Sequence, residues 1–347
     1  MNDERAVGLL QEMLEIYSPS TQEGELAEYL VAAMAERGFR AYRDGAGNAV
    51  GELGDGERQI LLLGHIDTVP GFIPVRIEGE IIYGRGAVDA KGPLAAFVAA
   101  AARVGPLPGK RIVVVGAVEE EAATSKGARY LLDKFSPDCV VIGEPSRWDR
   151  VTLGYKGRLL VDYALEQERS HTAGPRVGVC EAAVKFWQGV KDYARKYNRG
   201  KERMFERLDP SLRRIHSGGD GFSERVEATV ALRLPPGLDA ETLKDAIEGL
   251  AGEARLTFYA GEAPFRAFKN TPLARAFLAS IREHGGQPRF VLKSGTSDMN
   301  VVGPIWGCPI VAYGPGDSSL DHTPHEHLSL TEYGRAVKVL ECVLRGV

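Results

Sequence analysis

The segment Ile60-Leu61-Leu62-Leu63-Gly64-His65-Ile66-Asp67 sets the expected fold of this chain. Four consecutive apolar residues predict a short buried strand, and a histidine follows its end. Two further apolar runs have the same form: 111–118 leads into three glutamates, and 139–142 is followed by Gly143-Glu144. Helical patterns separate the runs, at 93–104 and 125–134. This alternation predicts an α/β fold, with a mostly parallel sheet and helices on both faces.

The pattern changes in the middle of the chain. Helices are expected on either side of the central segments, at 5–17, 23–37, 272–285 and 331–345, with strands at 290–293 and 310–313. From about residue 155 a different order appears, with strands at 159–165, 226–234 and 255–260, helices at 178–197 and 239–251, and one more strand near 212–216. This order is typical of a small α+β, ferredoxin-like sandwich. We therefore expect a catalytic domain at 1–154 and 265–347, and an inserted domain at 155–264.

Composition narrows the class of protein. The 347 residues, 44% apolar and 26% charged, allow two globular domains. A formal net charge of −4 gives no basic field for nucleic acid or an anionic membrane, and no apolar run reaches the roughly 18 residues of a membrane span. The first residues are polar, unlike a signal peptide. The four cysteines form no CxxC pair, which favours a reducing cytoplasm over a disulfide framework.

Polar residues with catalytic chemistry follow the predicted strands, at the edge where parallel sheets bind ligands. His65 and Asp67 are two residues apart in an extended segment, so their side chains project to the same side. His65 can bind a metal while Asp67 orients it; the alternative is a histidine with only a structural role. Glu144 follows the strand at 139–142 in the same way, and its alternative is an acid in a polar loop.

Two further segments contain acids whose positions favour a nearby cation. Asp89 comes just before a helix that Pro93 can begin, so it either caps this helix or bridges two metal ions. Glu119, Glu120 and Glu121 end an apolar strand, where adjacent charges are costly unless they meet cations. One of these glutamates can bind a metal while its neighbour acts as general base toward water.

The tract Asp321-His322-Thr323-Pro324-His325-Glu326-His327 holds three of the chain's seven histidines. Such a tract is typical of metal binding, and we expect one histidine to be a ligand and two to lie at the surface. The segments together offer two imidazoles and three carboxylates, with no thiol placed to help. These donors suit zinc, with cobalt or manganese as substitutes. Two ions about 3.5–4 Å apart would hold a water molecule and polarise a carbonyl.

Five motifs in order resemble the M20 metallopeptidase family over nearly the whole chain: GHIDTVPG (64–71), GRGAVDAKGPLAA (84–96), VEEEAATSKGA (118–128), IGEPS (142–146) and HTPHEH (322–327). The resemblance implies a catalytic domain interrupted by a lid domain that usually dimerises. It also implies two zinc ions per subunit, with cobalt as a substitute, held by His65, Asp89, Glu121, Glu144 and His325. Asp89 would bridge the ions, Asp67 would orient His65 and Glu120 would be the general base. The residues after the glutamates form a slightly longer segment than in many relatives, so a register with Glu119 as base and Glu120 as ligand stays open.

The same resemblance implies a substrate site. His171 resembles a lid histidine that reaches across the dimer to the oxyanion, and Arg233 resembles a lid arginine that holds the substrate carboxylate. Gly295 and Thr296 resemble a loop that lines the substrate pocket. Without the resemblance, His171 would be a surface histidine and Arg233 a charge at a strand edge.

Within the family, KSGTSDMN (293–300) and YGPGD (313–317) look most like one branch. That branch releases lysine or ornithine from the γ-carboxyl group of a C-terminal glutamate on a small acidic amino-group carrier protein, in lysine and arginine biosynthesis. Alternatives with the same chemistry are an N-acetylornithine or N-acetyllysine deacetylase, and a dipeptidase or carboxypeptidase. The alternative from another class is a noncatalytic metal-binding protein, which would need no general base.

Overall fold

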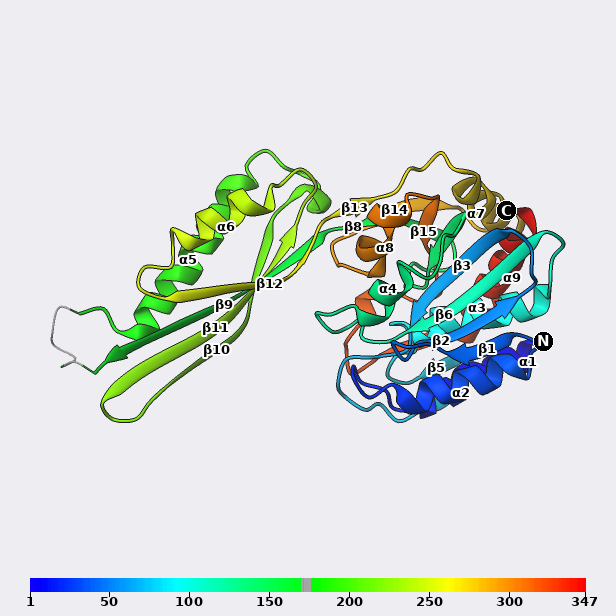
Figure 1. Ribbon diagram of the computed structural model, residues 1–347, viewed down its shortest axis with the longest axis horizontal. Helices are drawn as coiled ribbons and strands as arrows, with labels where there is room; N and C mark the ends of the chain where they lie inside the picture. The colour runs from blue at the N-terminus through cyan, green and yellow to red at the C-terminus, as the bar shows by residue number, and fades with distance from the viewer. Residues whose placement is uncertain (170, 172–175) are drawn as a thin grey trace. The chain divides into compact units, whose positions relative to one another are not determined.

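The computed structural model describes residues 1–169, 171 and 176–347, and the chain divides into two compact units (Figure 1). The first unit comprises Met1–Gly154, Arg266–Leu292 and Ser297–Val347, and the second comprises Tyr155–Phe265 and Lys293–Thr296. The division expected from the sequence lies beside these boundaries, except that residues 293–296 belong to the second unit. Among the described helices, none combines the length and the apolar character that a membrane span requires.

The first unit is built on a sheet whose centre is parallel. The central strands are β3 (Arg58–His65), β6 (Lys110–Ala117), β7 (Cys139–Ile142) and β15 (Ile310–Ala312). β3 pairs in parallel with both β6 and β7, and β15 continues this arrangement beside β7. Antiparallel strands flank the centre, namely β1 (Arg40–Arg43), β2 (Ala49–Leu53) and β8 (Arg150–Tyr155). The prediction of a mixed α/β fold with a mostly parallel sheet is confirmed.

Both faces of this sheet are covered. Every residue of β3 from Gln59 to His65 is buried, as expected for a strand with helices or loops packed on each side. The helices of the first unit are α1 (Asp3–Glu15), α2 (Gly24–Ala35), α3 (Lys91–Val104), α4 (Lys126–Leu131), α7 (Pro272–Glu283), α8 (Asp298–Trp306) and α9 (Leu330–Gly346). α3 is alanine-rich and is buried from Lys91 to Ala101, where it contacts the sheet, α1 and α9. A small separate sheet contains three strands, in the spatial order β16 (His327–Ser329), β5 (Ile81–Tyr83) and β4 (Arg76–Glu78).

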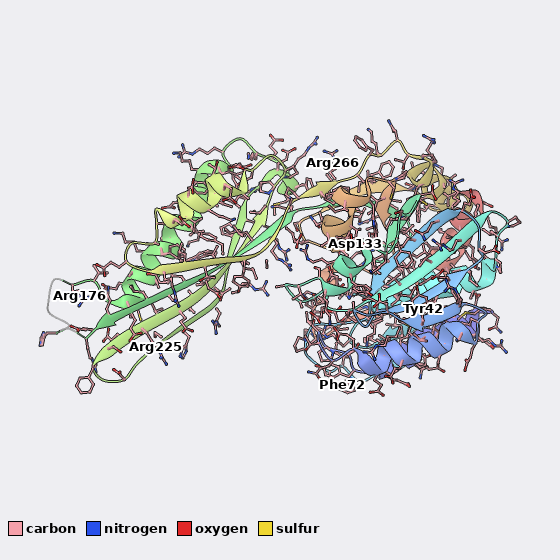
Figure 2. All side chains as sticks on the ribbon, viewed as in Figure 1. Tyr42, Phe72, Asp133, Arg176, Arg225 and Arg266 are labelled. Carbon is pink, nitrogen blue, oxygen red and sulfur yellow. The ribbon has the colours of Figure 1, made fainter. Side chains whose placement is uncertain are left out.

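The second unit is an antiparallel sheet with two helices. The strand order is β10 (Asp209–Gly219), β11 (Ser223–Leu234), β9 (Gly157–Glu168) and β12 (Arg255–Glu262). Buried and half-buried residues alternate along β9, because one face packs against α5 (Val179–Tyr197) and α6 (Ala240–Glu248). Side chains fill the interior of each unit separately (Figure 2). The remaining elements are β13 (Phe265–Arg266), β14 (Arg289–Lys293) and short 3₁₀ helices at Met204–Glu206 and Ser318–Leu320.

Candidate metal centre

Three neighbouring parallel strands deliver acidic and histidine side chains to one edge of the sheet. His65 is the last residue of β3, which lies between β6 and β7. Glu119–Glu121 follow the end of β6, and Glu144 lies two residues beyond β7. Because the carboxyl ends of parallel strands meet at the same edge, these residues converge although they are far apart in sequence.

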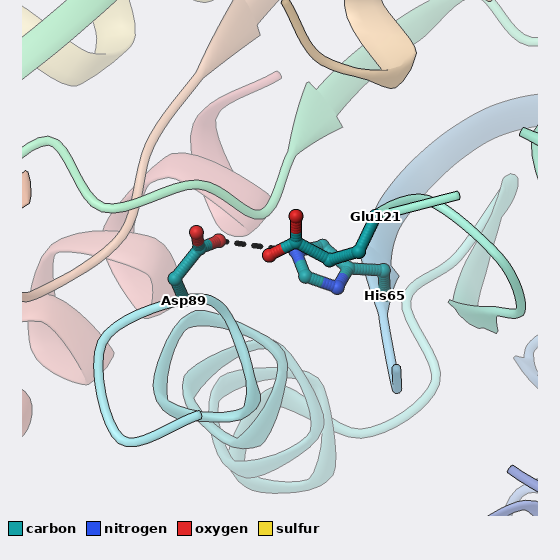
Figure 3. Close-up of side chains that lie close together, drawn as sticks. All are labelled: His65, Asp89 and Glu121. Atoms are coloured by element: carbon teal, nitrogen blue, oxygen red, sulfur yellow. Dashed lines mark hydrogen bonds and ion pairs between the residues drawn. The ribbon is translucent and has the colours of Figure 1, made fainter. Parts of the chain in front are cut away.

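Asp89 lies within the same cluster, opposite the histidine of β3. Asp89 Oδ1 is 3.3 Å from Nε2 of His65, and Glu121 lies beside this pair (Figure 3). Ligand atoms of His65, Asp89 and Glu121 lie within 4.8 Å of one another, as do those of His65, Glu120 and Glu144. The peptide bond between Asp89 and Ala90 is cis. These two overlapping groups, both of which contain His65, define one candidate metal centre.

Asp67 connects the histidine to the glutamates. Its Oδ1 accepts a hydrogen bond from the backbone N–H of Glu120 at 3.0 Å, and its Oδ2 accepts one from that of Glu121 at 2.9 Å. Nδ1 of His65 lies 2.9 Å from the carbonyl oxygen of Asp67 and 3.4 Å from its Oδ1. Contacts of this kind set the ring orientation of a metal-binding histidine, so the position of Asp67 suits the orienting role expected for it.

The three consecutive glutamates point to different partners. Glu119 has a positive φ of 58°, accepts a hydrogen bond from Thr124 Oγ1 at 2.6 Å and forms an ion pair with Lys126 at 3.4 Å. Glu120 and Glu121 instead belong to the two ligand groups. The geometry therefore favours the register in which Glu120 and Glu121, rather than Glu119 and Glu120, face the centre.

The structure places a different histidine of the C-terminal tract in the cluster from the one expected. Nε2 of His322 lies 2.8 Å from Glu121 Oε1 and 3.0 Å from Asp89 Oδ2. His325 is exposed, and its backbone, rather than its ring, contacts Thr323 and His327. His322 has a positive φ of 63°, so the backbone turns at this residue, and its ring meets the carboxylates of Asp89 and Glu121. His322 therefore takes the place in the cluster that was expected for His325.

The charges in the cluster shift the pKa values of its members. Burial lowers the pKa of His65, but its hydrogen bonds with Asp67 and Asp89 outweigh burial and raise the pKa well above the ordinary value. Hydrogen bonds to Asp89 and Glu121 raise the pKa of His322 to about 10. Burial and the nearby Asp89 carboxylate raise the pKa of Glu121 to about 6. Protons on these imidazoles thus balance the crowded carboxylates, which is the task that a bound cation would take over.

Glu120 occupies the most acid-rich part of the cluster. Burial raises the pKa of its carboxyl group well above the ordinary value; His65 opposes this shift, and the Glu144 and Asp298 carboxylates add to it. A carboxyl group with a raised pKa accepts a proton more readily than an ordinary glutamate. This environment distinguishes Glu120 from Glu119, which contacts a lysine and a threonine.

The donor set fits borderline metal ions. Imidazole nitrogens and carboxylate oxygens suit zinc, cobalt or manganese, and the closely spaced carboxylates would repel one another without a cation. Fold and centre together suit a metal-dependent hydrolase whose site lies at the carboxyl ends of a parallel sheet.

The comparisons with known proteins agree with this class. Residues 61–346 match the model of peptidase family M20/M25/M40. The LysW-lysine hydrolase of Deinococcus radiodurans is 47% identical to this chain over 344 residues, which are 97% of this chain and 95% of the relative. The LysW-lysine/LysW-ornithine hydrolase of Saccharolobus islandicus is 31% identical, over 96% of this chain and 94% of the relative. The chain therefore belongs to peptidase family M20/M25/M40 and is a hydrolase.

Solved structures share the fold over the whole chain. An M20 family metallo-carboxypeptidase from Sulfolobus solfataricus, Sso-CP2, superimposes with a TM-score of 0.82 at 21% identity, covering 100% of this chain and 99% of the other. The Bacillus subtilis protein YXEP, described as a dinuclear metal-binding peptidase of the M20 family, has a TM-score of 0.69 at 13% identity, covering 99% and 98%. At these identities the similarity concerns the fold alone.

Two of the expected substrate-binding residues contact each other in the second unit. Nη1 of Arg233 donates a hydrogen bond to Oγ1 of Thr296 at 2.8 Å, and this hydroxyl donates to the carbonyl of Lys156 at 3.1 Å. Gly295 precedes Thr296 in the same short segment. His171 is exposed and also belongs to the second unit, whereas the motif positions 172–175 that follow it lie outside the described residues.

Several residues that support the centre were not expected from the sequence. Ser20 donates its hydroxyl to Asp67 Oδ2 at 2.7 Å, and Glu23 Oε1 accepts from the backbone N–H of Glu119 at 3.1 Å. No pattern in the sequence places Ser20 at the centre, and Glu326 stands out only as part of the histidine-rich tract. Their role depends on contacts with residues more than 45 positions away, and no local spacing pattern encodes such contacts.

Proposed function

We propose that this enzyme hydrolyses the amide bond that joins lysine, and also ornithine, to the γ-carboxyl group of a C-terminal glutamate on a small acidic carrier protein. The observation that carries the substrate assignment is the 47% identity, over 97% of this chain, to a protein named LysW-lysine hydrolase. The Saccharolobus islandicus relative, whose name also includes LysW-ornithine, supports the second substrate. LysW is then the carrier protein that this enzyme would bind.

The metal centre is proposed to hold two Zn²⁺ ions, with Co²⁺ as a functional substitute. His65 and Glu144 would hold one ion, His322 and Glu121 the other, and Asp89 would bridge them. Support comes from Asp89, because its Oδ1 faces His65 and its Oδ2 faces His322. Bound ions would polarise the scissile carbonyl and make a nearby water molecule more acidic.

Glu120 is proposed as the general base. It takes a proton from the attacking water and passes it to the nitrogen of the departing amine, so that the C–N bond breaks and free lysine leaves. The raised pKa of the Glu120 carboxyl group supports this role, because a carboxyl group with a raised pKa holds a transferred proton more readily. Asp67 is proposed to orient His65 and the Glu120–Glu121 backbone through its hydrogen bonds to them.

The second unit is proposed to be a lid that also forms the dimer. Arg233, held by Thr296, would bind the substrate carboxylate, and His171 would donate a hydrogen bond to the oxyanion that forms at the scissile carbonyl. Within the described residues, β10 pairs only with β11 and forms an edge of the sheet, and most of its side chains are exposed. An exposed edge strand of this length can pair with a second copy, which supports a homodimer.

A substrate panel tests the proposal. Purified enzyme loaded with Zn²⁺ is incubated with carrier-linked lysine, carrier-linked ornithine, acetyllysine, acetylornithine and dipeptides, and the released amino acid is quantified. We expect kcat/KM for the carrier-linked substrates to exceed that for the others by at least about tenfold, a difference of about 1.4 kcal/mol in transition-state stabilisation. Preference for an acetylated amino acid or a dipeptide would contradict the proposed carrier-linked substrate. Full activity after chelation of the metal would contradict the proposed metal centre.

A further inference from the structure

Glu326, which is not a proposed metal ligand, forms hydrogen bonds with the backbone at Asp89, the proposed bridging residue. Glu326 is fully buried, and its Oε1 accepts hydrogen bonds from the backbone N–H groups of Val88 at 2.9 Å and Asp89 at 3.0 Å. Its own backbone carbonyl accepts from Gly84 N–H at 3.4 Å. Glu326 therefore fixes both ends of the 84–89 segment that presents the Asp89 carboxylate to the cluster.

The charge of Glu326 is matched by one buried arginine. Arg85 Nη1 donates to Glu326 Oε2 at 2.7 Å, and the side chains are 8% and 1% exposed. Arg85 Nε also donates to the carbonyl of Gly71 at 3.0 Å, which ties the pair to a third segment. A buried ion pair with these additional hydrogen bonds is costly to break, because removal of one partner leaves the other charge buried without compensation.

The pair also connects the segment of Asp89 to that of His322. Glu326 lies four residues after His322 and immediately before β16, which pairs with β5 through His327 and Tyr83. Asp89 Oδ2 and His322 Nε2, in turn, lie 3.0 Å apart in the cluster. The same short C-terminal tract thus contributes one group to the cluster and a second group that holds the backbone of its neighbour.

We infer that Glu326 and Arg85 are positioning residues that set the separation of Asp89 and His322 and thereby the affinity of the metal site between them. This inference rests on the metal centre proposed above, and it concerns neither the proton transfers nor the substrate. Glu326 acts through a backbone contact. Its carboxylate holds the N–H of Asp89 in place, and this fixes the position of the Asp89 carboxylate oxygens. Outer contacts of this type commonly change metal affinity about 10–100-fold when they are altered.

The test is a calorimetric titration of metal-free protein with Zn²⁺, together with the visible absorption spectrum of the Co²⁺-loaded protein. Glu326→Gln keeps an oxygen that can accept from Val88 and Asp89 but removes the charge that Arg85 requires. Arg85→Lys keeps the charge, but lysine lacks the planar guanidinium group that donates to both Glu326 and the Gly71 carbonyl. Because Asp89 is proposed to bridge the two ions, we expect each variant to bind Zn²⁺ about 10–100-fold more weakly than the wild type and to show an altered Co²⁺ spectrum.

Glu52→Gln is the matched control, because Glu52 is another buried glutamate of the first unit and pairs with Arg40 at 2.6 Å. It should change neither the Zn²⁺ affinities nor the Co²⁺ spectrum. If Glu326→Gln does not fold, Arg85→Lys decides the question by the same two measurements. Wild-type affinities and spectra in the folded variants would overturn this inference alone. A wild-type protein that binds no metal would overturn the proposed centre, and this inference with it.

Discussion

At the residue scale, two adjacent glutamates with the same side chain are given different roles by their surroundings. Asp67 accepts from the backbone of both Glu120 and Glu121, so the two side chains leave a rigid segment in different directions. Glu121 meets His322, whereas Glu120 is surrounded by other carboxylates and by His65. The proposed ligand and the proposed base therefore have the same side chain and differ in their neighbours.

Glu120→Gln tests the base directly. Glutamine has nearly the same shape but cannot accept the proton, so we expect both metal ions to remain bound and kcat to fall about 10²–10⁴-fold. Metal content by mass spectrometry and turnover of the carrier-linked substrate are measured together. Glu119→Gln is the control and should retain turnover, since Glu119 pairs with Lys126. Loss of metal in Glu120→Gln, together with loss of turnover in Glu119→Gln, would instead favour Glu119 as the base and Glu120 as the ligand.

His322 makes the stability of the metal-free protein depend on pH. Its pKa rises from an ordinary value of 6.5 to about 10 through hydrogen bonds to Asp89 and Glu121. Between these values the native protein binds more protons than the unfolded chain, so the stabilisation is complete below pH 6.5 and is lost as pH rises toward 10. In EDTA, the melting temperature of the wild type should fall more steeply from pH 6.5 to 9 than that of His322→Gln. His325→Gln should follow the wild type, and identical slopes for all three proteins would contradict the contacts of His322.

The sequence allowed most of the centre to be predicted, because each of His65, Glu121 and Glu144 follows an apolar run that reads as a buried strand. The sequence predicted His325 rather than His322 within the histidine-rich tract, and the difference from the structure has a physical reason. All three histidines there are close in sequence, and only the turn of the backbone at His322 decides which ring meets the carboxylates. Contacts such as Ser20 with Asp67 depend on the folded chain and have no local signal.

At the scale of secondary structure, long apolar strands were predictable and short or polar strands were not. β4, β5 and β16 have three residues each, too few to display a period, and their register depends on pairing with one another. β10 extends over Asp209–Gly219, whereas only a part near 212–216 was expected. Its exposed, charged residues and glycines lack the alternation of a half-buried strand, because β10 lies at the edge of its sheet.

The start of α3 shows how an element positions the centre. α3 begins two residues after Asp89, and its first turn packs so closely that a Cβ atom on Gly92 would lie 2.2 Å from the carbonyl oxygen of Ala87. The Ala87 oxygen belongs to the backbone, so it cannot turn aside as a flexible side chain would. Gly92 therefore allows the helix to approach the segment that carries Asp89.

Gly92→Ala should lower the free energy of unfolding by about 1–3 kcal/mol, the usual cost of overpacking a rigid site. Urea denaturation of the metal-free protein measures this change. Gly8→Ala is the matched control, because Gly8 lies within α1 and a Cβ atom there would meet nothing within 4 Å. Alanine favours helix over glycine by about 1 kcal/mol, so this control should be stabilised. Equal stabilisation of both variants would show that the contact at Gly92 is not restrictive.

At the scale of the whole molecule, the proposed chemistry is divided between the two units. The proposed metal ligands and Glu120 belong to the first unit, whereas His171, Arg233 and Thr296 belong to the second. A residue of the second unit can take part in the reaction only if it reaches a centre that the first unit supplies. In a homodimer, that centre can belong to the same chain or to the partner, and the two arrangements predict different behaviour of mixed variants.

His171→Ala should fold and bind metal normally, but its kcat should fall about 10²–10³-fold with little change in KM, because an oxyanion donor acts mainly in the transition state. If His171 acts on the partner's centre, mixing inactive His171→Ala with inactive Glu120→Ala chains should restore partial activity. A mixed dimer would then contain one centre in which both residues are intact. The mixture is prepared under conditions of subunit exchange, and an affinity tag on one chain isolates the mixed dimers. Mixed dimers without activity would exclude a shared centre, and normal turnover of His171→Ala alone would exclude His171 from the reaction.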